Sequence, residues 1–69
     1  MMHDISIIIP VFNEEESLNE LIEQLDELVN RMNEKSIEII FIDDGSNDNT
    51  NEIIAKKTKH KDYIKLILD

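Results

Sequence analysis

Hydrophobic residues alternate along this chain between short continuous runs and one longer periodic stripe. Ile5–Ile9 is short, β-branched and almost wholly apolar, which predicts a strand that is covered on both faces and ended by Pro10. Ile37–Ile42 repeats this pattern and predicts a second buried strand, and Tyr63–Leu68 predicts a third.

Between the first two strands, apolar residues recur at intervals of three and four, which is typical of an amphipathic helix. The members of this apolar stripe are Leu18, Leu21, Ile22, Leu25, Leu28, Val29 and Met32. Two pairs are candidates for the helix start, Asn13 with Glu16 and Ser17 with Glu20, and the pair with Ser17 fits a capping box better.

The rest of the chain contains turn residues and a second, weaker helical pattern. A turn is expected at Asn33–Ser36, and the Gly, Ser, Asn and Asp cluster of Asp43–Asn49 predicts a loop. Asn49 with Glu52 is a capping pair for a helix that runs to about Lys59. The predicted order is β-α-β-α-β, with no internal repeat, low-complexity segment or linker.

This order of elements places two loops together. Strands joined by helical crossovers must be parallel and the crossovers are right-handed, so the loops that follow the strands lie along one edge of the sheet. Pro10–Glu14 and Asp43–Asp48 are therefore expected to be neighbours. Ligands of open α/β sheets bind at this carboxyl edge, which makes it the expected site.

Length and composition indicate one small globular domain. A chain of 69 residues buries only about 60% of its unfolded surface, so the core is expected to be thin. It contains no cysteine, which excludes a disulfide framework and a cysteine-ligated zinc site. The apolar run Ile7–Phe12 is far shorter than the roughly 20 residues that span a bilayer, and nothing cleavable precedes it, so we expect a cytoplasmic chain.

The net charge of −9 is unevenly distributed. Residues 1–55 are strongly acidic, which argues against nucleic acid as a partner because that affinity rests on Lys and Arg contacts to phosphate. The basic segment Lys56–Lys61 either contacts an anionic lipid surface or complements the negative end of a helix dipole, and we favour the second. His3 and His60 lack a partner pattern, so we expect both to be solvated.

The candidate chemistry lies in carboxylates and one aromatic ring. Gly45 is the only glycine, so the glycine-rich motifs that bind dinucleotides or triphosphates are absent. Carboxylates only accept hydrogen bonds, so Asp44 and Glu14 suit a ligand with donors, such as ribose hydroxyls or the ring N–H of uracil or guanine. Phe12 would lie against the face of the base. Together these residues predict a nucleoside site.

A simpler interpretation exists for each acidic residue. Asp43 and Asp44 are of a type that commonly binds backbone donors of a following turn, and Glu14, Glu15 and Glu16 suit the first turn of a helix. Because the two loops converge, we prefer the functional interpretation for Glu14 and Asp44, but not for the other two glutamates. Asp43 receives no assigned role.

The segments Ser6–Glu16, Glu38–Ser46 and Asp48–Thr50 together resemble the N-terminal part of family 2 glycosyltransferases. The resemblance is closest to enzymes that move a sugar from a nucleotide onto dolichyl or undecaprenyl phosphate, and it covers nearly the whole chain. It implies the α/β class, with a three-layer, Rossmann-like β-α-β-α-β half of a GT-A fold and a parallel, truncated sheet. Residues 1–69 would then be a single, incomplete N-terminal segment that binds a nucleotide sugar.

The resemblance also implies a ligand and its contacts. The donor would be a UDP- or GDP-sugar whose diphosphate is bridged by Mg²⁺ or Mn²⁺. By matching motif, Pro10, Phe12, Glu14, Ile42 and Asp44 would contact the nucleoside, with Asp44 accepting from the base and Glu14 from the ribose. Phe12 stands where the family often has Tyr, so a contact through a phenolic hydroxyl is lost while stacking is retained.

A cation has its own physical reason, because an acidic body repels a diphosphate unless a cation screens it. The resemblance implies an Asp-x-Asp motif and a proton-accepting carboxylate at positions beyond Asp69. We therefore expect no catalytic and no metal-binding residue within this chain, no strong cation binding, and no sugar transfer by the isolated 69 residues. The complete enzyme would use a lipid-phosphate or saccharide acceptor at the cytoplasmic face of a membrane.

Three alternatives belong to other classes. A phosphate-receiving signalling domain also places paired acids after a strand, but no later strand supplies a phosphoacceptor Asp. A calcium loop fails because Gly45 is misplaced and position twelve counted from Asp44 is Ala55. The more serious alternative is a non-catalytic α/β fragment that self-associates through an open sheet edge, because the first strand lacks a further partner.

Overall fold

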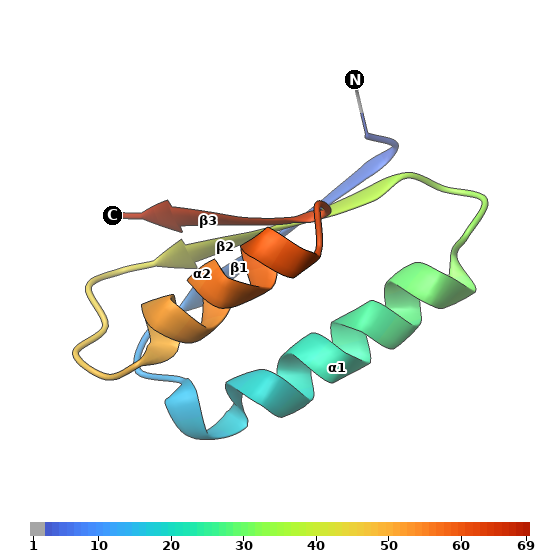
Figure 1. Cartoon of the computed structure of the whole chain (residues 1–69). Coiled ribbons are helices and arrows are strands. Elements are labelled where there is room, and N and C mark those ends of the chain that lie inside the picture. The colour runs from blue at the N-terminus through green and yellow to red at the C-terminus, as the bar shows by residue number, and fades with distance from the viewer. Residues whose placement is uncertain (1–2) are drawn as a thin grey trace.

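The computed structural model describes residues 3–69. Its elements are β1 (Ile5–Val11), α1 (Glu15–Arg31), β2 (Ile37–Asp43), α2 (Thr50–His60) and β3 (Ile64–Leu68). The three strands form one parallel sheet in the order β1-β2-β3, and both helices pack on the same face of it (Figure 1). The predicted α/β class, parallel sheet and β-α-β-α-β order are confirmed.

The two faces of the sheet differ in exposure. Side chains that point toward the helices form the core, where Ile39 and Phe41 pack with Leu18 of α1 and Ile54 of α2, all of them fully buried. We expected strands covered on both faces, but Ile8, which points the other way, is 61% exposed. Successive right-handed crossovers through strands in sequential order place both helices on one side. Residues 3–69 therefore supply two of the predicted three layers.

Pro10 does not end the first strand, contrary to the prediction, because β1 continues to Val11. The Val11 carbonyl accepts the N–H of Asp44 at 3.3 Å, so the backbone polar groups of Val11 face β2. Neighbouring residues of a parallel strand face opposite sides, so Pro10 faces the open edge of the sheet. Its missing N–H leaves no sheet hydrogen bond unformed there.

Both predicted capping pairs of the first helix are wrong. α1 begins at Glu15, so Ser17 lies inside its first turn and its hydroxyl donates to Glu14 Oε2 at 3.2 Å. Within residues 3–69 the N-cap residue Glu14 makes no side-chain cap bond, and neither does Asn49, which stands at the predicted N-cap of α2. Asn13 lies outside the helix with a φ of 51°. The Asp48 carboxylate instead accepts an N–H group at the start of each helix.

The remaining boundaries lie close to the predicted ones. β2 extends one residue beyond Ile42, β3 begins one residue after Tyr63, and α2 ends one residue after Lys59. Of the apolar stripe in α1, Leu18 is buried while Leu28 is 38% exposed. No helix in the described part of the chain is long and apolar enough to cross a membrane.

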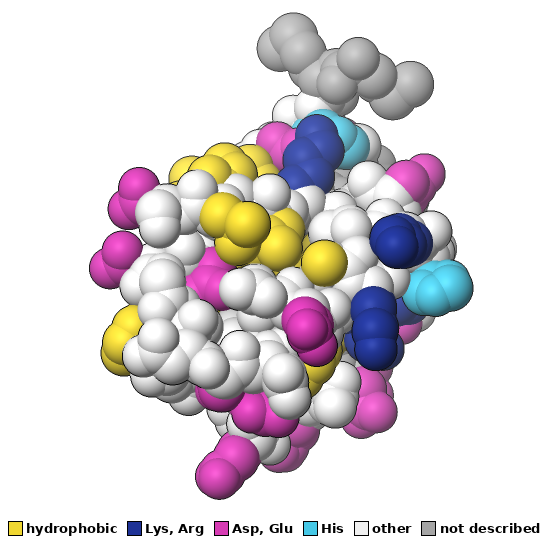
Figure 2. All heavy atoms as spheres, turned by 60° about the vertical axis from the view of Figure 1, so that its left-hand side comes forward, with side chains coloured by type: hydrophobic (Ala, Val, Ile, Leu, Met, Phe, Trp, Pro, Cys, Tyr) yellow, Lys and Arg dark blue, Asp and Glu magenta, His cyan; other side chains and the backbone are white. Residues whose placement is uncertain are grey.

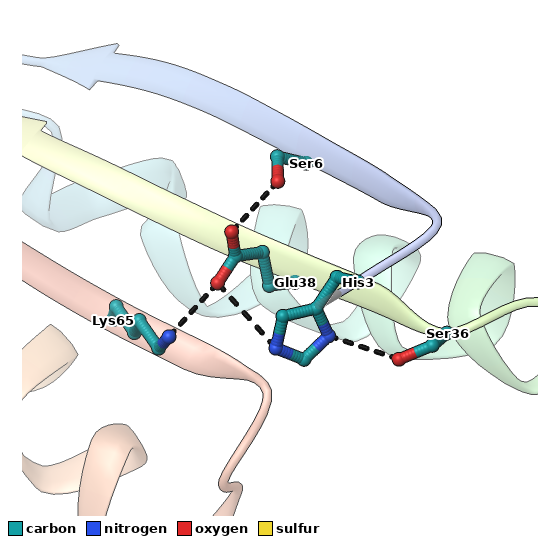
Figure 3. A network of polar contacts seen from close by, with 5 residues as sticks. All are labelled: His3, Ser6, Ser36, Glu38 and Lys65. Carbon is teal, nitrogen blue, oxygen red and sulfur yellow. Dashed lines mark hydrogen bonds and ion pairs between the residues drawn. The ribbon is translucent and has the colours of Figure 1, made fainter. Parts of the chain in front are cut away.

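His3, which we expected to be solvated, belongs to a polar network at the amino end of the strands (Figure 3). Its Nδ1 lies 2.9 Å from Ser36 Oγ and its Nε2 lies 3.5 Å from Glu38 Oε2. Glu38 also accepts hydrogen bonds from Lys65 at 2.9 Å and from Ser6 at 2.7 Å, and these two bonds hold its pKa below the ordinary value. The network links all three strands on the face without helices.

Candidate functional site

The loops that follow β1 and β2 lie side by side at the carboxyl edge of the sheet, as predicted (Figure 1). We call Phe12–Glu14 the first loop and Asp44–Asn49 the second loop. The parallel register pairs Val11 with Asp43, so both loops leave the sheet at the same level. Direct hydrogen bonds from Asn13 to Ser46 and Asn47 then join the two loops.

Three consecutive backbone N–H groups at the start of α1 donate to side-chain oxygens from the second loop and the start of α2. The pairs are Asn13 with Ser46 Oγ at 2.9 Å, Glu14 with Thr50 Oγ1 at 2.9 Å, and Glu15 with Asp48 Oδ2 at 3.2 Å. A helix start leaves its first N–H groups without partners inside the helix. The second loop therefore caps the first helix from outside, which fixes the two loops to one another.

Asp48 connects the starts of both helices. One carboxylate oxygen accepts the N–H of Glu15, and the other accepts the N–H of Thr50 at 2.9 Å and the Thr50 hydroxyl. The hydrogen bond from the Thr50 hydroxyl is the largest cause that lowers the pKa of Asp48. No separate role for Asp48 was predicted from the sequence. An Asp two residues before a Thr at a helix start is the local signal that indicates such a cap.

Asp43 is buried, with 1% of its surface exposed. Its Oδ1 accepts the N–H of Ser46 at 3.0 Å and the Ser46 hydroxyl at 2.6 Å, so it forms the turn that the simpler interpretation described. Its Oδ2 is buried and has no hydrogen-bond partner within residues 3–69. Gly45 completes the turn with a φ of 77°, in the left-handed region that glycine adopts without strain.

The five residues predicted to contact a nucleoside divide into two groups. Phe12, Glu14 and Asp44 lie in the loops and are exposed, Phe12 by 53%. The Asp44 carboxylate makes no hydrogen bond to any other residue of the described chain. Pro10 and Ile42 are partners in the strand register and point to the sheet face without helices. The fold brings the two loops together, and each of the two strand residues lies two positions before the start of a loop.

A pocket of about 410 Å³ lies at the N-terminus of α1. Its lining residues are Asn13, Glu14, Glu15, Glu16, Ser17 and Asp48. Of the predicted nucleoside contacts only Glu14 lines it, so the pocket is beside the predicted site and does not coincide with it. The carboxylates of Glu15 and Asp48 are engaged in hydrogen bonds between the loops.

The carboxyl edge of the sheet is acidic on the side where α1 begins. Figure 2, turned so that this edge comes forward, shows hydrophobic side chains in the upper part of the view with Asp and Glu side chains around them, several of which lie along the bottom. In the described part of the chain, no three His, Cys, Asp or Glu side chains are grouped so that they could hold a metal ion. The arrangement offers hydrogen-bond acceptors and an exposed ring to a ligand that carries donors.

Comparison with known proteins connects this geometry to one family. The sequence model of glycosyl transferase family 2 matches residues 6–68. The chain is 41% identical over 58 residues to the undecaprenyl-phosphate 4-deoxy-4-formamido-L-arabinose transferase of Salmonella choleraesuis, and it matches the proteins of that name from Salmonella paratyphi B and Salmonella newport to the same extent. These matches cover 84% of this chain but 17% of each relative.

Proposed function

The chain belongs to glycosyl transferase family 2, and we propose that it is the nucleotide-binding, N-terminal segment of an enzyme that transfers a sugar from a UDP- or GDP-sugar. The observation that carries the proposal is the joined pair of loops at the carboxyl edge, which presents Phe12, Glu14 and Asp44 to solvent. The names of the relatives favour a polyprenyl phosphate as acceptor, and hence a place at the cytoplasmic face of a membrane.

Each exposed side chain has a distinct role in this proposal. The Asp44 carboxylate accepts a hydrogen bond from the ring N–H of the base, and Glu14 accepts one from a ribose hydroxyl. The ring of Phe12 packs against the face of the base, and Pro10 and Ile42 extend the apolar contact beside it. The free Asp44 carboxylate supports this assignment, because a ligand donor would not have to displace an existing partner.

The diphosphate of the donor needs a cation to offset its charge beside so many carboxylates, and Mg²⁺ or Mn²⁺ supplies that screening in the complete enzyme. In the described residues no three His, Cys, Asp or Glu side chains are grouped to hold such an ion. We propose that the metal ligands and the catalytic carboxylate lie outside this chain. The chain spans 17% of the relatives' length, which supports the proposal that other parts of a longer protein supply both. The isolated 69 residues are then expected to transfer no sugar.

Titration of the ¹⁵N-labelled chain with UDP, GDP and their sugars tests the nucleoside site. We expect amide shifts at Phe12, Glu14 and Asp44, and a dissociation constant that rises about tenfold in Asp44→Asn, because the amide accepts a hydrogen bond without the negative charge. Asp62→Asn is the matched control, since Asp62 is exposed before β3 at the opposite edge of the sheet.

Unchanged amide shifts at saturating nucleotide, or equal affinity in the two variants, would contradict the nucleoside site. A separate assay addresses activity. Metal-dependent turnover of a UDP- or GDP-sugar by the isolated chain would contradict the expectation that it is inactive, without affecting the binding site.

A second candidate function is self-association without catalysis. Within residues 3–69 no strand pairs with the outer side of β1, and Ile8 on that strand is 61% exposed. An open strand edge pairs readily with the edge of another chain. The occupant in this proposal is a second copy of the same chain.

A further inference from the structure

A chain of three groups connects the core of the sheet to the first loop. It begins at Asp43, which is the last residue of β2, is 1% exposed and lies opposite Val11 in the register. It passes through the Ser46 hydroxyl and ends at the backbone N–H of Asn13. We call these three groups the relay. Its first member, the Asp43 side chain, is held in place by β2 and the surrounding core.

The chemistry of the relay fixes its direction. A serine hydroxyl has one hydrogen to donate and lone pairs to accept with. The Ser46 hydroxyl donates its hydrogen to Asp43 Oδ1 at 2.6 Å, which leaves its oxygen as an acceptor for the Asn13 N–H at 2.9 Å. The Ser46 N–H also donates to the same Asp43 oxygen, so two bonds orient Ser46.

A second hydrogen bond, which we call the return bond, joins the loops in the opposite direction. The Asn13 side-chain Oδ1 accepts the N–H of Asn47 at 2.8 Å, so Asn13 is held both through its backbone and through its side chain. Asn13 has a φ of 51°, a conformation that Asn tolerates better than most residues. Because Asn13 stands between Phe12 and Glu14, its backbone orientation determines where both of those side chains point.

We propose that Asp43 and Ser46 are positioning residues of the nucleoside site, which hold Phe12 and Glu14 of the first loop in register with Asp44 of the second. The proposal rests on the proposed function and deepens it. Asp43 is 1% exposed and its Oδ1 is occupied, so it acts through Ser46 rather than on a ligand. In this proposal, Asp43 is buried and orients Ser46, whereas its neighbour Asp44 is exposed and contacts the ligand.

Ser46→Ala tests the relay, because it removes the hydroxyl and keeps the backbone turn. We expect the dissociation constant for UDP or GDP to rise about tenfold, and the Asn13 amide to shift and exchange faster with solvent in the absence of nucleotide. Ser46→Thr retains the hydroxyl and is expected to restore both readouts. Ser6→Ala is the matched control, because its hydroxyl bonds Glu38 at the other end of the strands.

Asp43 variants separate positioning from direct contact. Asp43→Asn keeps an oxygen that accepts from Ser46, so binding close to that of the wild type is expected. Asp43→Ala removes the acceptor and is expected to match Ser46→Ala. A loss in Asp43→Asn as large as that in Asp43→Ala, in a chain whose circular dichroism is unchanged, would overturn the positioning role.

Two results distinguish this inference from the proposed function. If the wild type binds nucleotide and Ser46→Ala binds it equally well, the relay is overturned and the nucleoside site stands. If the wild type binds no nucleotide, the proposed function fails and the positioning role fails with it. Asn13→Gly provides a second variant, because it removes the return bond without adding strain at a positive φ, and unchanged affinity there would also count against the link.

Discussion

Thr50 is a buried polar residue that connects the starts of the two helices. It is completely buried, its hydroxyl accepts the N–H of Glu14 at 2.9 Å, and it donates to Asp48. A buried N–H without a partner loses its hydration and gains nothing in exchange. The start of α1 therefore depends on a side chain 36 residues away in the sequence.

We expect Thr50→Val, which keeps the volume and removes the hydroxyl, to lower the free energy of unfolding by about 1 kcal/mol, since it removes the acceptor of the part-buried Glu14 N–H. Urea unfolding followed by circular dichroism measures this loss. Thr58→Val is the matched control, because the Thr58 hydroxyl only donates to the Ala55 carbonyl within α2. Equal losses in the two variants would show that the contact between the loops adds nothing beyond a local hydroxyl bond.

The positions of the residues at the carboxyl edge could be predicted from the sequence, but their hydrogen-bond partners could not. Asp43 and Asp44 were expected at a strand end because an apolar run and a cluster of turn residues are both local signals. The partner of Asp48 was not predictable in this way, because the Glu15 N–H that it accepts is 33 residues away and is brought near only by the strand register. The different environments of Asp43 and Asp44 likewise depend on the fold. Asp43 ends β2 and is buried, whereas Asp44 begins the loop and is exposed.

Asp26 joins three elements outside the candidate site. It lies in α1, accepts the Tyr63 hydroxyl, and pairs at 3.1 Å with Lys61 at the end of α2. The hydrogen bond from Tyr63, followed by that from Lys61, lowers the pKa of Asp26. Burial, followed by the bond to Asp26, raises the pKa of Tyr63. These contacts connect α1 to the residues that precede β3.

The pKa shifts of Asp26 and Tyr63 predict that the contact between them stabilises the fold most between the acid range where Asp26 is protonated and the alkaline range where Tyr63 is ionised. The pKa of Asp26 is lower in the folded chain, so its contribution is present above the ordinary value of 3.8 and is lost as pH falls through the folded value. The pKa of Tyr63 is raised, so its contribution is present below the ordinary value of 10.0 and is lost as pH rises through the folded value.

Urea unfolding of the wild type and Tyr63→Phe across this pH range measures both effects. We expect Tyr63→Phe to lower the free energy of unfolding by about 1 kcal/mol near neutral pH, because the Asp26 pair is partly exposed to solvent. The variant should also lack the part of the alkaline loss that Tyr63 causes. Parallel pH profiles for the two chains above the ordinary pKa of Tyr63 would contradict this assignment.

The elements themselves were predictable, and their ends were less so. The stripe in α1 and the apolar runs of the strands indicated type and order correctly because both are periodic along the chain. Pro10 and Ser17 were misjudged for a shared reason, since local rules assign a proline to a strand end and a serine to a cap. In the fold, Pro10 lies at an open sheet edge, and Asp48 of the second loop and Thr50 of α2 accept the N–H groups at the start of α1 in place of Ser17.

The sheet face without helices has two chemically distinct zones. Its amino end carries the network around Glu38, which bonds Ser6 and Lys65 across the three strands. Its carboxyl half is apolar, and the register aligns Pro10 with Ile42 and Ile42 with Ile67, which is 51% exposed. An apolar half-face beside an open strand edge favours association, whereas the net charge of −9 opposes it.

This balance predicts self-association that depends on salt. We expect sedimentation of the chain at high concentration to show species larger than a monomer, in a fraction that increases with ionic strength, because salt screens the repulsion between acidic copies. Ile8→Lys should abolish these species, since it places a cation on the exposed residue of the edge strand. Leu28→Lys is the control, because Leu28 is 38% exposed on α1, which packs on the opposite face of the sheet from the Ile8 side chain (Figure 1). A monomer at every salt concentration, or an equal effect of the two substitutions, would exclude pairing through β1.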